Sequence, residues 1–163
     1  MVKGEGGKEF ERQCRATLEI WCPKNGLILS NQKKLSFPKP GGGRHYVDIE
    51  IVSAQNENIR GLFSCKWQKS GGTTDEKIAY EVIKLLSAME HDPRYVHSWI
   101  AMGGTGWSES ILGFVSTGEI QKWIPAMQNR VTIFLDPNDL MQRAKSEIVL
   151  ESKYENYLKN PIN

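Results

Sequence analysis

Two neighbouring segments carry acids and a lysine in a pattern that suits metal-assisted chemistry on a phosphate. In residues 44–53 and in residues 62–68, apolar and polar positions alternate, which is typical of strands with one apolar and one polar face. Carboxylates bind Mg²⁺ through hard oxygen atoms, and a lysine can orient a water molecule or offset negative charge. The polar faces carry, in chain order, Asp48, Glu50, Ser64, Lys66 and Gln68.

These two segments most simply pair as a hairpin, which would bring their polar faces side by side. The same alternation also fits an exposed hairpin whose outer face is merely polar, and the pattern alone leaves both interpretations open. A partly exposed histidine, His45, precedes the acidic strand, and it has either no special role or a contact with a phosphate.

The remaining elements predict an α/β domain. Apolar residues recur at helical spacing in residues 8–21, and Pro23 with Asn25-Gly26 would stop that helix. A second helix begins near Thr73, which has capping-box spacing to Glu76, and ends near His91. Further strands are expected at residues 96–102 and 130–135, with short helical segments between them and a C-terminal helix after Asp136. We expect one domain over residues 1–163, with a mixed sheet.

Composition excludes several classes of protein. The chain has 163 residues, 39% hydrophobic and 25% charged, which is typical of a globular domain. A net charge of +2 is too small for a polycation, so affinity for nucleic acid would need a local patch. Three cysteines fit neither a disulfide framework nor a zinc site. No signal peptide or membrane span is visible, so we expect a cytoplasmic protein with reduced thiols.

The sequence resembles the PD-(D/E)XK nuclease superfamily, which has the restriction-endonuclease-like fold, a mixed β-sheet flanked by helices. The resemblance covers about residues 4–145, and its strongest part is FSCKWQKSGGTTDEKI. GKEFERQCRATLE would be the first helix, RHYVDIEIV the strand with the motif aspartate, and WIAMGGTGW and RVTIFLDPNDL the later strands. By position, the resemblance implies that Asp48 binds metal and that Lys66 is the catalytic lysine. It also implies the backbone carbonyl of Cys65 as a metal ligand, and Glu11 as a further one.

The sequence departs from the motif at Ser64, where the superfamily has Asp or Glu two residues before the lysine. Some restriction enzymes of this fold instead take a glutamate from the following helix, and Glu81, fifteen residues after Lys66, matches that position. Glu50 or Glu11 could also complete the metal site, although same-face strand positions are about 7 Å apart. The third possibility is a site that binds DNA without cutting it.

The resemblance implies Mg²⁺-dependent cleavage of double-stranded DNA by a small type II restriction endonuclease or a subunit of one. Cutting both strands would then require a homodimer or a partner subunit. The alternative is a catalytically inactive subunit that binds DNA or serves in assembly. A weaker possibility is nucleotide binding by the GGTG segment, which lacks the lysine of a P-loop. The residues expected to contact DNA are Lys33, Lys34, Lys39, Arg44, Gln68 and Lys69.

Overall fold

The two alternating segments form the antiparallel hairpin that their sequences predict. Strand β4 spans Ile49–Ser53 and strand β5 spans Arg60–Trp67, and Ile49 pairs with Phe63. The structure is a computed structural model that describes residues 4–70 and 76–159. The predicted start of the second helix at Thr73 lies outside these residues.

The hairpin is the centre of a five-stranded mixed sheet with the strand order β1-β4-β5-β6-β7. Strand β1 (Leu27–Leu29) is antiparallel to β4, whereas β6 (Tyr95–Gly103) and β7 (Val131–Phe134) continue the sheet parallel to β5. A separate two-stranded ladder joins β2 (Lys33–Lys34) to β3 (Tyr46–Val47). The predicted fold class, an α/β domain with a mixed sheet flanked by helices, is confirmed.

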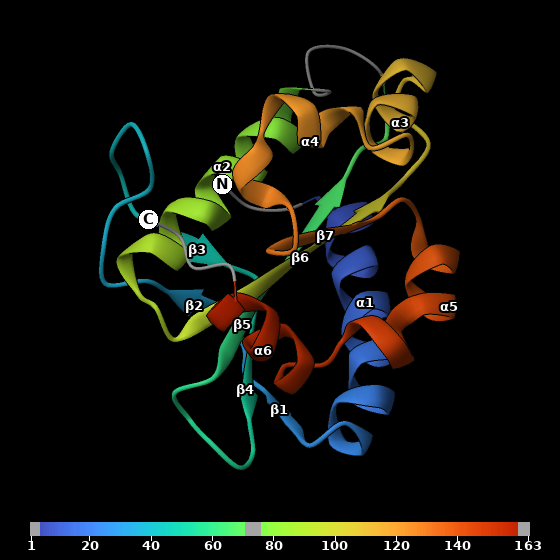
Figure 1. Ribbon diagram of the computed structural model, residues 1–163. Coiled ribbons are helices and arrows are strands. Elements are labelled where there is room, and N and C mark those ends of the chain that lie inside the picture. The colour runs from blue at the N-terminus through green and yellow to red at the C-terminus, as the bar shows by residue number, and fades with distance from the viewer. Residues whose placement is uncertain (1–3, 71–75, 160–163) are drawn as a thin grey trace.

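Helices cover both faces of the sheet (Figure 1). On one face, α1 packs against α5, and α6 lies beside them. On the other face lies α2, with α3 and α4 packed against one another. The helices are α1 (Glu5–Lys24), α2 (Glu76–His91), α3 (Glu109–Ser116), α4 (Glu119–Trp123), the 3₁₀ turn η1 (Pro125–Met127), α5 (Pro137–Glu147) and α6 (Glu151–Lys159).

Each face of the sheet has its own apolar core. Phe10, Cys14 and Leu18 recur along α1 and are buried against Phe63 and neighbouring sheet residues. On the opposite side, apolar residues of α2 at helical spacing pack with Leu62 and with residues of β6 and α3: Ile78, Val82, Leu85, Ala88 and Met89. Burial of these apolar faces fixes the direction in which the polar residues of β5 point.

Several predicted details differ from the structure. Helix α1 is longer than residues 8–21, and Pro23 lies in its last turn, where Asn25 donates its N–H to Trp21 O at 2.9 Å. The alternation in residues 44–53 would place Val47 on the same face as Ile49, but Val47 packs in the α2-side core and Ile49 in the α1-side core. A bend at Asp48 separates β3 from β4 and interrupts the alternation there.

Strand β7 is an edge strand of the sheet, and polar side chains of α5 contact its outer side. Asp136 caps this helix by accepting the N–H of Asp139 at 2.8 Å. Asp139 Oδ2 accepts the backbone N–H of Leu135 at 2.9 Å, and Arg143 Nη1 donates to Ile133 O at 3.4 Å. Asp139 and Arg143 also form an ion pair at 3.0 Å. These contacts satisfy backbone groups that the edge strand cannot pair with another strand.

The three cysteines, Cys14, Cys22 and Cys65, are free and buried, and burial raises the pKa of the Cys22 thiol to about 12.

Within residues 4–70 and 76–159, no helix has the length and apolar character required to cross a bilayer.

Candidate active site

Strand β5 presents Ser64 and Lys66 to the α2 side of the sheet. Their neighbour Leu62 lies in the α2-side core, whereas Phe63 and Cys65 lie in the α1-side core. Ser64 is buried and the side chain of Lys66 is 28% exposed. The alternation of the strand therefore points the serine and the lysine toward helix α2.

Glu81 of α2 meets both side chains. It lies on the buried face of the helix with Ile78 and Val82, and is only 3% exposed. Ser64 Oγ donates a hydrogen bond to Glu81 Oε1 at 2.7 Å, and Lys66 Nζ lies 3.0 Å from Glu81 Oε2. The structure thus brings a carboxylate from the following helix to the serine that occupies the position of the expected acid.

A second lysine, Lys84, contacts the same carboxylate oxygen. Its Nζ lies 2.7 Å from Glu81 Oε2, one helical turn away, and its side chain is 15% exposed. Burial alone raises the pKa of Glu81, but the charges of Lys66 and Lys84, with hydrogen bonds from Lys84 and Ser64, outweigh burial and lower that pKa below its ordinary value. Glu81 is therefore ionised at neutral pH.

Asp48 is held beside these residues by the backbone of β5. It sits at the bend between β3 and β4, is 8% exposed, and its Oδ2 accepts the N–H of Cys65 at 2.7 Å. Because Ser64 and Cys65 are consecutive, the two carboxylates of Asp48 and Glu81 are anchored at adjacent residues of one strand. A charge-assisted hydrogen bond of this kind restrains the carboxylate orientation.

The other expected metal ligands have different surroundings. Glu50 accepts a hydrogen bond from the Tyr95 hydroxyl at 2.5 Å and pairs with Arg60 at 3.4 Å, so its oxygens are engaged away from Ser64. Burial and the Glu50 hydrogen bond raise the pKa of Tyr95 well above its ordinary value. Glu11 is half-buried on α1.

The residues present fit a hard divalent cation. Two buried carboxylates, from Asp48 and Glu81, provide the oxygen chemistry that Mg²⁺ or Mn²⁺ requires, and the backbone of Cys65 contacts Asp48 through its N–H. In the described part of the chain, no group of three or more His, Cys, Asp or Glu side chains is arranged to hold a metal ion. A site here would therefore combine two side chains with backbone and water oxygens.

A family model of the PD-(D/E)XK nuclease superfamily domain matches residues 41–144, well over half of the chain. The chain belongs to this superfamily. No curated protein and no solved structure matches it. The matched segment contains Asp48, Ser64 and Lys66, where the sequence resemblance places the motif, together with Glu81, whereas Glu11 lies outside it.

The residues that the sequence predicts to contact DNA lie in β2, just before β3 and just after β5. Strand β2 pairs with β3 through Lys33–Val47 and Lys34–Tyr46, which places both exposed lysines next to the strand that leads into Asp48. Arg44 is exposed just before β3, and Lys69 is exposed just after β5. Gln68, which directly follows β5, is half-buried, and its side-chain amide donates to Ser70 O.

The GGTG segment supports the end of β5. Gly103 O accepts the N–H of Gln68 at 3.0 Å and the indole N–H of Trp107 at 2.8 Å, and Gly106 donates its N–H to Gln68 O at 2.8 Å. Gly104 has a φ of +89°, and a Cβ there would lie 2.1 Å from Gln68 O. The close approach of this segment to Gln68 therefore explains why it contains glycines.

Sequence reasoning missed Lys84 and misjudged the burial of His45. His45 was expected to be partly exposed, but it is only 2% exposed, because β2–β3 pairing and the ring of Phe37 enclose it. Lys84 was not considered at all. Its spacing of three residues from Glu81 is the signal that could have found it, since residues i and i+3 of a helix are neighbours.

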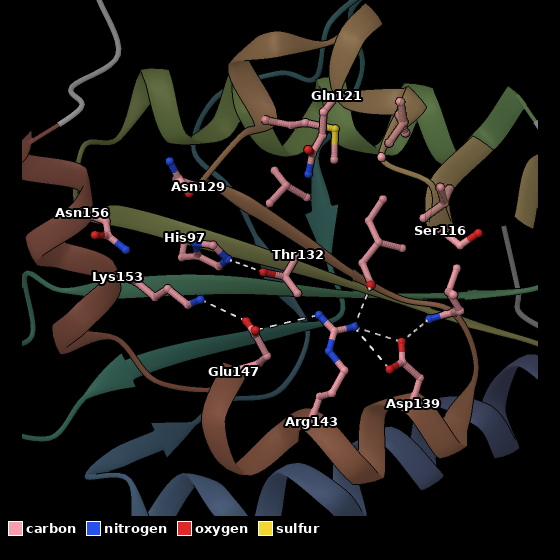
Figure 2. Close-up of a pocket in the computed structure, with 17 residues that line it drawn as sticks. His97, Ser116, Gln121, Asn129, Thr132, Asp139, Arg143, Glu147, Lys153 and Asn156 are labelled. Atoms are coloured by element: carbon pink, nitrogen blue, oxygen red, sulfur yellow. Dashed lines mark hydrogen bonds and ion pairs between the residues drawn. The ribbon is translucent and has the colours of Figure 1, made fainter. Parts of the chain in front are cut away.

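A cavity of about 470 Å³ lies elsewhere, along the β7 edge between α4, α5 and α6 (Figure 2). His97 and Thr132 line it, with the His97 Nε2 2.8 Å from the Thr132 hydroxyl oxygen. Burial, followed by the charge of Lys153, lowers the pKa of His97 to about 3. None of the residues expected at the active site lines this cavity, and its charged residues are paired with one another: Asp139, Arg143, Glu147 and Lys153.

Proposed function

We propose that this protein is a metal-dependent DNA endonuclease, a type II restriction endonuclease or a subunit of one, with Mg²⁺ as its cofactor. The observation that carries this proposal is the contact of Glu81 with Ser64 and Lys66. The motif acid is missing from β5, and a buried, ionised carboxylate from α2 contacts the serine at that position. The chain also belongs to a superfamily whose members are generally nucleases, which supports phosphodiester hydrolysis as the reaction.

In this mechanism, Asp48 and Glu81 would hold the cation, with the carbonyl of Cys65 as a further oxygen ligand. When bound, the cation polarises the scissile phosphate, lowers the pKa of a bound water and neutralises charge on the leaving oxygen. Ser64 orients Glu81 by donating a hydrogen bond to Oε1. The other oxygen, Oε2, then faces the ammonium groups of Lys66 and Lys84.

Lys66 acts on the reacting phosphate. Its ammonium group lies at Glu81 Oε2 and its side chain is partly exposed, so it can reach both the carboxylate and a substrate. There it orients the attacking water and offsets the negative charge that develops on the phosphate in the transition state. The exposed Lys33, Lys34 and Arg44 would bind the phosphate backbone of the duplex next to this point.

One such site cleaves one strand, so we propose that the enzyme acts on double-stranded DNA as a homodimer or with a partner subunit. The competing function is a DNA-binding subunit with an inactive site. Its specific support is Ser64, a neutral residue at the motif position, together with the engagement of Glu81 by two lysines.

The test is cleavage of DNA substrates of varied sequence by the purified protein with Mg²⁺ or Mn²⁺. We expect the wild type to cut, and Asp48→Asn to lose most of this activity while it still binds duplex DNA. A wild-type protein that binds DNA but cuts none with either metal would contradict the endonuclease proposal and favour the binding subunit.

A further inference from the structure

The segment that contains β2 and β3 carries a local concentration of positive charge. Residues 33–47 include four basic side chains and no acidic one, although the net charge of the whole chain is only +2. All but the half-buried Lys39 are exposed: Lys33, Lys34 and Arg44. The ladder of β2 and β3 is separate from the main sheet, and the loop that connects them projects beside α2 (Figure 1). A charge distribution of this kind attracts polyanions.

The loop ends in a glycine turn, residues 38–44, which we call the tip. Gly41, Gly42 and Gly43 have φ angles of +85°, +94° and +92°, a region that favours glycine. Gly42 donates its N–H to Lys39 O at 2.9 Å, which closes the turn. In the part of the chain that the structure describes, no atom lies within 4 Å of where a Cβ would be at Gly41 or Gly42. The turn thus requires the glycines, and their bare backbone allows a phosphate to approach closely.

Tyr80 of α2 holds the tip in place. Its hydroxyl donates a hydrogen bond to Pro40 O at 2.8 Å. Its ring contacts Lys84, whose Nζ lies 5.6 Å from the ring centroid, and Lys84 pairs with Glu81. Tyr80 is 42% exposed, so water could satisfy its hydroxyl and burial does not require this hydrogen bond. Direct contacts therefore connect the tip, through Tyr80 and Lys84, to the proposed metal ligand Glu81.

The tip is also fixed relative to Asp48. Before the tip, the ring of Phe37 stacks on His91 at the end of α2, with centroids 4.7 Å apart. After the tip, Arg44 precedes Asp48 by four residues, so their Cα atoms lie at most about 14 Å apart. Each strand of a duplex has one phosphate per about 3.4 Å of its axis. A cation on the tip can therefore meet a phosphate within about four base pairs of one held at Asp48.

We propose that the tip binds the phosphate backbone of the duplex through Lys39, Arg44 and its glycine backbone, and that Tyr80 is the residue that positions the tip. This inference rests on the proposed function in one respect, that the substrate is duplex DNA. The planar guanidinium of Arg44 can bind two phosphate oxygens at once. Without the Tyr80 hydrogen bond the tip keeps its charges, but it must be ordered when DNA binds, which lowers the affinity.

The test is duplex binding by the full chain without divalent metal, measured by fluorescence anisotropy of a labelled duplex of mixed sequence at several salt concentrations. Tyr80→Phe removes the hydroxyl and keeps the ring that contacts Lys84. We expect about fivefold weaker binding, the effect of one neutral hydrogen bond, with the wild-type salt dependence, because the same phosphate contacts form in the complex. The control is Tyr154→Phe, which removes a hydroxyl from α6 on the other face of the sheet and should bind like the wild type.

Two variant backgrounds form the second arm of the experiment. Lys39→Gln with Arg44→Gln should make the slope of log K against log salt shallower by up to about 2, because each lost phosphate contact removes about 0.9 from that slope. Tyr80→Phe should lose most of its effect in this background, since it then positions a tip without charges. In the background of Lys33→Gln with Lys34→Gln, which lie outside the tip, the fivefold effect should persist.

Two further measurements separate positioning from folding and from chemistry. Thermal unfolding should show Tyr80→Phe as stable as Tyr154→Phe, because the hydroxyl of Tyr80 lies at the surface. Single-turnover cleavage at saturating enzyme should proceed at the wild-type rate in Tyr80→Phe, because the substitution affects binding and not the chemical step.

The outcomes separate this inference from the function on which it rests. Equal DNA affinity of Tyr80→Phe and the wild type would overturn the role of Tyr80, even if the enzyme cuts DNA. An undiminished effect of Tyr80→Phe in the background without Lys39 and Arg44 would overturn it as well. A wild-type slope in that background would show that the tip binds no phosphate. The expected pattern in a wild type that cuts no DNA would leave the inference standing and overturn the endonuclease function. A wild type that binds no duplex DNA would overturn both.

Discussion

Replacement of Glu81 by Gln tests the displaced carboxylate directly. The change preserves the shape of the side chain and an oxygen that can accept from Ser64, but removes the negative charge that two ammonium groups and a cation would share. Loss of a preorganised charge contact of the transition state costs about 10²–10³ in rate. At 1.36 kcal/mol per tenfold, this is about 3–4 kcal/mol in activation free energy.

The same substitution has a smaller effect on folding. Lys66 and Lys84 lose their counter-ion, but their side chains are 28% and 15% exposed and can move toward water. We therefore expect the free energy of unfolding to fall by about 1–2 kcal/mol, less than for a fully buried pair. That corresponds to a decrease of a few degrees in melting temperature for a chain of this length, so the variant should remain folded at assay temperature.

Single-turnover cleavage of a DNA substrate that the wild type cuts, with enzyme in excess and Mg²⁺ or Mn²⁺ present, measures the rate of the chemical step. Glu76→Gln is the matched control, because Glu76 is an exposed acid at the start of the same helix. Glu76→Gln should cut at the wild-type rate, whereas Glu81→Gln should be as impaired as Asp48→Asn. The double variant of Asp48 and Glu81 should be little worse than either alone, because both act through one cation.

An active wild type with a fully active Glu81→Gln variant would refute the assignment of Glu81 as the replacement for the motif acid. A rate loss equal in Glu76→Gln and Glu81→Gln would refute it too, since it would show a general effect of charge on α2. A loss confined to DNA binding, with an unchanged single-turnover rate at saturating enzyme, would place Glu81 outside the reaction.

Two further substitutions distinguish the proposed enzyme from a binding subunit and locate its DNA contacts. Ser64→Glu places a second carboxylate against Glu81 in a buried position. If the wild type is an active enzyme, we expect this variant to cleave more slowly, because the two like charges repel each other. If the wild type is inactive, a gain of cleavage in this variant would support the binding-subunit alternative. Replacement of Lys33, Lys34 and Lys39 by Gln should make the slope of log K for duplex binding against log salt shallower by up to about 2–3, because each lost phosphate contact removes about 0.9 from that slope. The control replaces the exposed Lys24, Lys122 and Lys145 by Gln, and an equal change of slope there would contradict a local patch.

The hairpin and the direction of its polar face were predictable because strand alternation is a local property. An apolar face on each strand requires its polar residues to point the opposite way, and Ser64 and Lys66 do lie on the side opposite Phe63 and Cys65. The position of Glu81 was suggested by resemblance to enzymes with a displaced glutamate. Its contact with Ser64 is seen in the structure, while its role as a metal ligand stays a prediction.

The features that sequence reasoning missed depend on contacts between distant segments. The bend at Asp48 moves Val47 to the opposite core, and nothing in the alternation of residues 44–53 signals it. The burial of His45 depends on the pairing of β2 with β3 and on Phe37, neither of which a local pattern specifies. Lys84 would have been treated as a solvated helix residue, because its role depends on which face of α2 meets β5.

The polar cover of β7 limits how this chain can assemble. Asp139 and Arg143 occupy the backbone groups of Leu135 and Ile133 that an added strand would need, and both belong to a helix whose apolar face is part of the α1-side core. A second sheet could join edge-to-edge at β7 only by breaking these side-chain contacts with Leu135 and Ile133. Continuous sheets through β7, whether in a productive dimer or in an ordered aggregate, are therefore disfavoured. Two copies that act on opposite strands of a duplex would therefore associate more favourably through other surfaces.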